Sequence, residues 1–152
     1  EVFVPGMSIK RIIVKSAGPY SAKMVFRESP FRIGMDEYNR WAQRPTDMIR
    51  RYFGLFFGPP AGENLVAPEN ELELFITILT FECDMVDKKA AAAINVQIRR
   101  IKPERTLSDE TYNETTAMTA MTAEAFAAAM SKNIQQIADK VRLKLVEIHQ
   151  HN

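Results

Sequence analysis

Apolar and polar residues alternate along much of the first third of the chain. A β-rich run from Ile9 to Val14 ends at Ala17-Gly18-Pro19, where a turn is expected. A second run covers Met24 to Phe26, and Phe31 to Met35 alternates in the manner of a third strand. The pattern therefore predicts three short strands arranged as a meander.

A helix is predicted next. Pro45-Thr46-Asp47 is typical of a helix start, because proline is tolerated in the first turn and Asp47 complements the positive end of the helix dipole. Gly58-Pro59-Pro60 should end the helix, and a loop should continue to Asn70. Apolar residues at spacings of three and four give this helix one strongly apolar face: Met48, Ile49, Tyr52, Phe53, Leu55 and Phe56.

The longest predicted strand, Leu72 to Met85, changes its pattern partway. Apolar residues occupy one face up to Ile78 and the other face from Leu79 onward, so we expect a bulge or a change of packing environment. Cys83 should lie on the apolar face. A turn at Asp87-Lys88-Lys89 and a strand around Ile94 to Ile98 then complete a long antiparallel hairpin.

The last part of the chain predicts one more strand and a long helix. Thr106 to Met118 is rich in threonine, and Thr122 is a good N-cap for a helix from Ala123 to about His149. A coiled-coil dimer is one interpretation of its apolar seam, but docking onto the sheet is favoured because the sheet needs covering. The seam residues are Phe126, Met130, Ile134, Ile137, Val141, Leu145 and Ile148.

These elements predict an α+β fold, in which an antiparallel sheet with a long hairpin is covered by two amphipathic helices. With 152 residues and 46% hydrophobic residues, the chain suits one domain, residues 1–152.

Charge and cysteine content restrict the classes of function. Lys and Arg total 20 against 19 for Asp and Glu, so the net charge of +1 provides no strong field for nucleic acid or an anionic membrane. Cys83 is the only cysteine, which excludes an intramolecular disulfide, a zinc ribbon and a redox pair. We expect no nucleic-acid partner.

Catalytic patterns are missing from the sequence. It contains no Gly-x-Ser-x-Gly elbow, no phosphate-binding glycine loop and no His-Glu-x-x-His motif, and His149 and His151 lie in the terminal segment. A small hydrolase that uses a carboxylate pair remains as an alternative, because folding can join distant acids. We expect no catalytic residue, no cofactor and no metal, and we expect the domain to act by binding a partner.

The segment from Ile12 to Phe53 resembles the auxiliary lipoproteins of Gram-negative ABC-type transport systems, the family that includes the outer-membrane lipoprotein of the paraquat-inducible transport operon. The similar pieces are an opening strand, Val25-Phe26-Arg27, and Tyr38-x-x-Trp41 followed by Pro45 at a helix start. The hairpin from Leu72 to Ile101 and the alanine-rich last helix agree in order and length.

The resemblance implies a periplasmic accessory lipoprotein, anchored in the outer membrane, that binds an MCE-domain protein of a lipid-transport system. Lipid is a second candidate ligand. The family's lipid-bearing cysteine should follow a signal peptide, so we expect both before Glu1, and membrane attachment only through that anchor. A periplasmic adaptor unconnected with lipid is the alternative in the same class.

Four residues are the candidates for partner contact, because Arg, Tyr and Trp dominate binding hot spots: Arg27, Tyr38, Arg40 and Trp41. In a purely structural interpretation, Trp41 packs as a lid over the first helix and Tyr38 caps the beginning of that helix.

Overall fold

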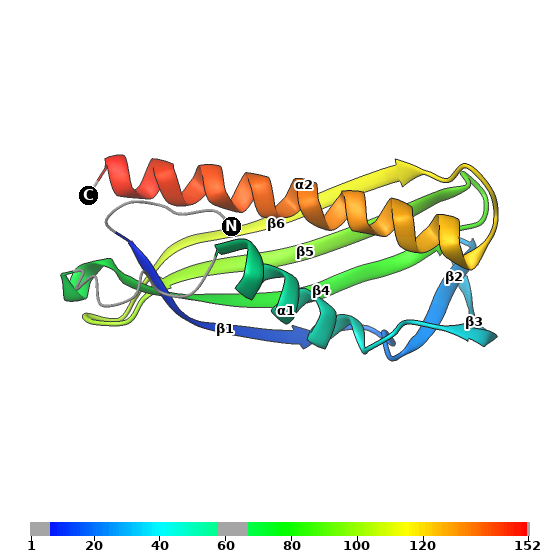
Figure 1. The fold of residues 1–152 in the computed structure, drawn as a ribbon, viewed down its shortest axis with the longest axis horizontal. Helices are drawn as coiled ribbons and strands as arrows, with labels where there is room; N and C mark the ends of the chain where they lie inside the picture. The colour runs from blue at the N-terminus through cyan, green and yellow to red at the C-terminus, as the bar shows by residue number, and fades with distance from the viewer. Residues whose placement is uncertain (1–6, 58–66, 152) are drawn as a thin grey trace.

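The structure is a computed structural model that describes residues 7–57 and 67–151. It combines one sheet with two helices, and is therefore α+β as predicted (Figure 1). The elements follow in the order β1 (Ser8–Ser16), β2 (Lys23–Ser29), β3 (Arg32–Arg40), α1 (Pro45–Phe57), a 3₁₀ turn (Pro68–Asn70), β4 (Glu71–Asp84), β5 (Lys89–Arg100), β6 (Arg105–Ala117) and α2 (Ala123–Gln150).

The sheet is mostly antiparallel and follows the order β3-β2-β4-β5-β6, with β1 also paired to β4. Strands β4, β5 and β6 form the long hairpin and its continuation, as predicted. Of the predicted meander, β2 and β3 do form an antiparallel hairpin, but β1 and β2 do not pair with each other. Both run parallel to β4, which at 14 residues is long enough to pair with two short strands in succession.

A bulge in β4 marks the position where its neighbour changes. The register with β5 shifts between Ile78 and Thr80, and Ile78 is the last residue of β4 that pairs with β1. β2 begins to pair only at Cys83. The predicted irregularity is therefore confirmed, and the extra residue at Leu79 returns Phe81 and Cys83 to the buried side while Leu79 itself stays exposed.

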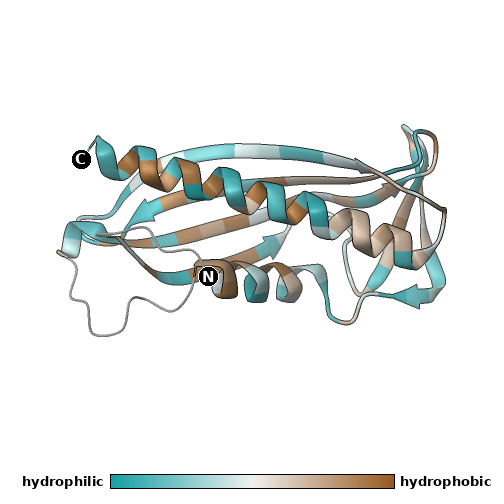
Figure 2. Ribbon diagram, turned by 45° about the horizontal axis from the view of Figure 1, so that its top comes forward, coloured by the Kyte–Doolittle hydropathy of each residue, from teal (hydrophilic) through white to brown (hydrophobic). Residues whose placement is uncertain are grey.

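Both helices cover the same face of the sheet (Figure 1). α2 packs along β5 and β6, and α1 packs beside β1. The hydropathy colouring of Figure 2 shows apolar residues recurring along both helices. The seam of α2 from Phe126 to Leu145 is buried and Ile148 is partly buried, so docking on the sheet is confirmed.

Polar contacts cap the start of α2 and attach its middle to the sheet. The hydroxyl of Thr122 accepts a hydrogen bond from the Ala125 backbone N–H at 3.1 Å, which makes Thr122 the predicted N-cap. Farther along, the amide of the fully buried Asn133 donates to the Ala90 carbonyl at 3.0 Å, and its oxygen accepts from the Thr116 hydroxyl at 2.6 Å. Asn133 therefore joins α2 to both β5 and β6.

α1 begins at Pro45 as predicted and buries Ile49, Phe53 and Phe57 against the sheet. The predicted stop at Gly58-Pro59-Pro60, and the loop after it up to Val66, lie outside the described residues. Within residues 7–57 and 67–151, no helix combines the length and apolar character that crossing a membrane requires.

Candidate functional site

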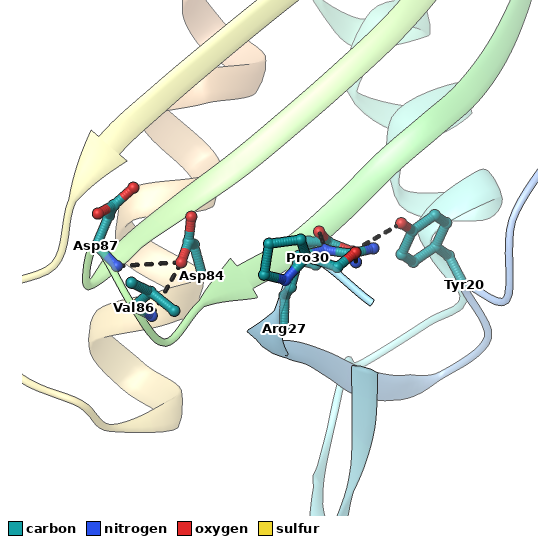
Figure 3. Close-up of polar contacts among 7 residues, drawn as sticks. Tyr20, Arg27, Pro30, Asp84, Val86 and Asp87 are labelled. Carbon is teal, nitrogen blue, oxygen red and sulfur yellow. Dashed lines mark hydrogen bonds and ion pairs between the residues drawn. The ribbon is translucent and has the colours of Figure 1, made fainter. Parts of the chain in front are cut away.

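The β2–β3 hairpin is held against β4 by a buried carboxylate. Glu82 of β4 accepts hydrogen bonds from Arg27 of β2, with Nε–Oε1 at 2.5 Å and Nη2–Oε2 at 3.3 Å. The Tyr20 hydroxyl donates to Oε2 of the same carboxylate at 2.9 Å, and Arg27 Nη1 donates to the Pro30 carbonyl at 3.0 Å. Figure 3 shows Arg27 beside Pro30 with the Tyr20 side chain pointing toward the same place.

In this Tyr20-Arg27-Glu82 cluster, the pKa values of Tyr20 and Arg27 are both raised, so both groups stay protonated. Burial, followed by the neighbouring charge of Glu82, raises the pKa of Tyr20 to about 12. The hydrogen bond to Glu82 raises the pKa of the Arg27 guanidinium. Because Glu82 accepts bonds from two side chains that remain protonated, it acts as a structural acceptor that joins β2, β4 and the turn before β2.

Several other carboxylates also have partners within the molecule. Asp84 accepts from the backbone N–H groups of Val86 and Asp87 at 2.9 and 3.1 Å, which closes the turn between β4 and β5 (Figure 3). Asp36 accepts from Asn39, Asp109 from Asn95 and Gln97, Glu73 pairs with Arg11, and Glu110 pairs with Lys144. These contacts favour a role in folding for each of them.

Trp41 is partly buried and packs against the core. Its ring lies 5.2 Å from the ring of Phe81 and 5.0 Å from that of Phe126, measured between centroids. It also lines a small cavity of about 180 Å³ together with Met48 and Tyr52 of α1. Trp41 thus packs against β4 and α2 and faces the same cavity as α1, so the structural interpretation of this residue as a packing side chain is supported.

Tyr38 and Arg40 lie elsewhere, on β3, and both are exposed. Tyr38 is 93% exposed, and its backbone N–H donates to Asp36 Oδ1 at 2.9 Å. Tyr38 therefore does not cap α1; that expectation was wrong because β3 continues to Arg40, five residues before the helix begins. The structure separates the four predicted contact residues into an internal pair, Arg27 and Trp41, and an external pair, Tyr38 and Arg40.

β3 forms one border of the sheet, since among the described strands it pairs with β2 alone. It carries exposed apolar side chains at alternate positions: Ile33 is 38% and Met35 is 39% exposed, while Phe31, in the turn before the strand, is 99% exposed. The sequence pattern predicted a strand here, but one sequence contains no signal that identifies a border strand. We call the exposed part of β3 with Phe31, Tyr38 and Arg40 the β3 edge.

A cavity of about 410 Å³ opens where the hairpin, the turn after β4 and the start of α2 meet. Five of its thirteen lining residues contain sulfur: Met24, Cys83, Met85, Met118 and Met121. We call it the methionine pocket. Sequence analysis missed it, although Met118 and Met121 just before the N-cap of α2 were a possible signal.

Comparison with known proteins identifies a family. The family model described as the ABC-type transport auxiliary lipoprotein component matches residues 20–142. No curated protein matches the chain.

Two solved structures share the fold. A crystal structure from Xanthomonas campestris has a TM-score of 0.80 at 19% identity, covering 99% of this chain and 94% of that one. A second, of an uncharacterized protein, has a TM-score of 0.76 at 9% identity and covers 92% of each chain. At these identities the two structures support the fold alone.

Proposed function

Since this chain belongs to the family of ABC-type transport auxiliary lipoprotein components, we propose that it is a non-enzymatic accessory of an MCE-linked lipid-transport system. In this proposal the domain lies in the periplasm, is attached to the outer membrane by a lipid anchor outside the present chain, and binds an MCE-domain protein.

The observation that carries the partner-binding proposal is the β3 edge. A border strand presents unpaired backbone N–H and C=O groups, which an extended segment of another protein can pair with by strand addition. Soluble monomers usually protect such edges with charges or short strands. β3 has such charges at both ends and in its second half, where Asp36 also accepts from the Tyr38 and Asn39 N–H groups. In its first half, Ile33 and Met35 leave apolar side chains exposed.

In this proposal, Tyr38 and Arg40 make direct contact with the partner, whereas Arg27 and Trp41 act indirectly. Arg27 fixes the hairpin to Glu82, and Trp41 fixes the end of β3 between Phe81 and Phe126. A rigid edge reduces the entropy lost on binding.

The test is a calorimetric titration with the MCE-domain protein encoded beside the gene. Tyr38→Ala and Arg40→Ala should each weaken binding by about 2 kcal/mol, roughly 30-fold in Kd, without unfolding the domain, because both side chains are exposed. Ile33→Lys should also weaken binding, since a charge on an edge strand opposes strand addition.

Matched controls come from the helices. Arg51→Ala on α1 and Leu143→Lys on α2 change exposed residues of comparable type away from β3, and should leave Kd unchanged. Undiminished binding by the three β3 variants would remove the β3 edge from the proposal. No binding by the wild-type domain would overturn the MCE partnership.

A further inference from the structure

The methionine pocket has the size and lining of a site for an apolar ligand. Its volume of about 410 Å³ lies within the range of about 300 to 1,000 Å³ typical of small-molecule sites. Four of the eight methionines of the chain line it: Met24, Met85, Met118 and Met121.

The lining favours a flexible, unbranched ligand. Methionine side chains are themselves unbranched and polarizable, so they adapt to an aliphatic chain in many conformations. Cys83 is buried among them, with its Sγ 3.4 Å from Met118 Sδ, and Phe26 and Phe126 add aromatic surface. Met85 and Met121 are both partly exposed, at 43% and 42%, which places thioethers at the accessible part of the pocket.

The polar part of the lining is acidic. Asp36, Asn39, Thr122 and Glu124 supply it, and none of the described lining residues is Lys or Arg. Asp36 is held in its charged form, because hydrogen bonds from the Asn39 side chain and from two backbone N–H groups lower its pKa. A ligand with an anionic head would therefore place like charges together, whereas a cationic head would complement Asp36 and Glu124.

We infer that the methionine pocket binds the aliphatic chain of an amphiphile whose head is cationic or neutral rather than anionic. This inference deepens the proposed lipid-transport function, on which it rests, by naming a site and a class of ligand.

Two probes with the same chain length and opposite head charge test the inference: dodecylamine and dodecanoate, each titrated below its micelle concentration at pH 7. The readout is the NMR spectrum of the protein labelled with ¹³C at the methionine methyl groups. The four pocket methionines should shift saturably with dodecylamine. Met7, Met35, Met48 and Met130, which lie outside the pocket lining, are internal controls and should not. Dodecanoate should bind at least about tenfold more weakly.

A pair of charge variants tests the acidic lining. Glu124→Gln removes an exposed carboxylate beside the pocket and should reduce the preference for dodecylamine roughly threefold. Glu147→Gln, an exposed change near the other end of α2, should have no effect.

Three results would overturn the inference. The first is a uniform shift of all eight methionine signals, which indicates nonspecific detergent binding. The second is equal or tighter binding of dodecanoate. The third is that dodecylamine shifts none of the methionine signals and the pocket methionines shift only when the MCE-domain protein is added. That result would make the pocket a binding site for a segment of that protein. The probe titration uses the isolated domain, so its failure leaves the binding of a partner to the β3 edge untouched and separately measurable.

Discussion

Tyr20 illustrates how a single hydroxyl depends on its surroundings. Its ring lies so close to Gly18 that a Cβ at that glycine would come within 2.5 Å of Tyr20 Cε2. Its hydroxyl donates to the buried Glu82. Burial of the ring, followed by the charge of Glu82, holds the phenol in its neutral form.

We therefore predict that alkaline pH destabilises the protein through Tyr20. The folded-state pKa of about 12 exceeds the ordinary value of 10.0, so the neutral phenol contributes stability in full below pH 10. That contribution, about 3 kcal/mol, should disappear as the pH rises from 10 to 12. Denaturant melts should show that the difference in free energy of unfolding between wild type and Tyr20→Phe decreases between pH 10 and pH 12. Tyr38→Phe removes an exposed hydroxyl, so its stability should depend on pH as that of wild type does. A stability difference between wild type and Tyr20→Phe that stays constant over this pH range would contradict the prediction.

Cys83 should react slowly with thiol reagents in the native protein. It is buried, and burial followed by the charges of Asp84 and Glu82 raises the pKa of its thiol, so less of the reactive thiolate forms. Labelling by a disulfide reagent should become fast only in denaturant. Rapid labelling of native protein would show that the methionine pocket opens readily to the thiol.

At the scale of elements, one apolar face of α2 holds this helix against the sheet. Ile137 lies at its middle and is completely buried, whereas the adjacent Gln136 is exposed. The helix dipole and the Thr122 cap define where α2 begins, but the contact with β5 and β6 determines its position on the sheet.

We predict that Ile137→Asp costs about 3 kcal/mol or more of folding stability, because it buries an unpaired carboxylate. Gln136→Asp places the same group in solvent and should cost far less. Thermal melts of the two variants make the comparison, and equal stability would mean that the wrong face of α2 has been assigned to the core.

At the scale of the molecule, β4 organises the architecture. β1 and β2 pair with it in succession on one side and β5 pairs on the other, while the bulge at Leu79 separates the two regions. Figure 1 shows β2 and β3 at the end of the sheet where α2 begins. The Tyr20-Arg27-Glu82 cluster and the methionine pocket include residues of this same end of β4, Glu82 and Cys83. Both proposed binding surfaces therefore lie at one end of the sheet.

Local sequence patterns determined the elements themselves. The alternation around Ile94 to Ile98, the Thr122 cap and the seam of α2 predicted elements that the structure contains, because periodicity and capping depend on residues close together in the chain. The change of pattern within Leu72 to Met85 even located the bulge. The combination of Arg27, Tyr38, Trp41 and Pro45 indicated the family that the family model then identified.

Only the tertiary structure decided which elements become neighbours. The parallel pairing of β1 and β2 with β4 and the contacts among Tyr20, Arg27 and Glu82 join residues up to 63 positions apart. The position of β3 at the border of the sheet was decided in the same way. Strand partners are selected by the packing of the whole sheet and not by local periodicity, so the pairing of β1 with β2 was mispredicted. Residue type alone proposed all four contact residues. The structure shows that Arg27 and Trp41 contact other parts of the same domain. Tyr38 and Arg40 are exposed to solvent.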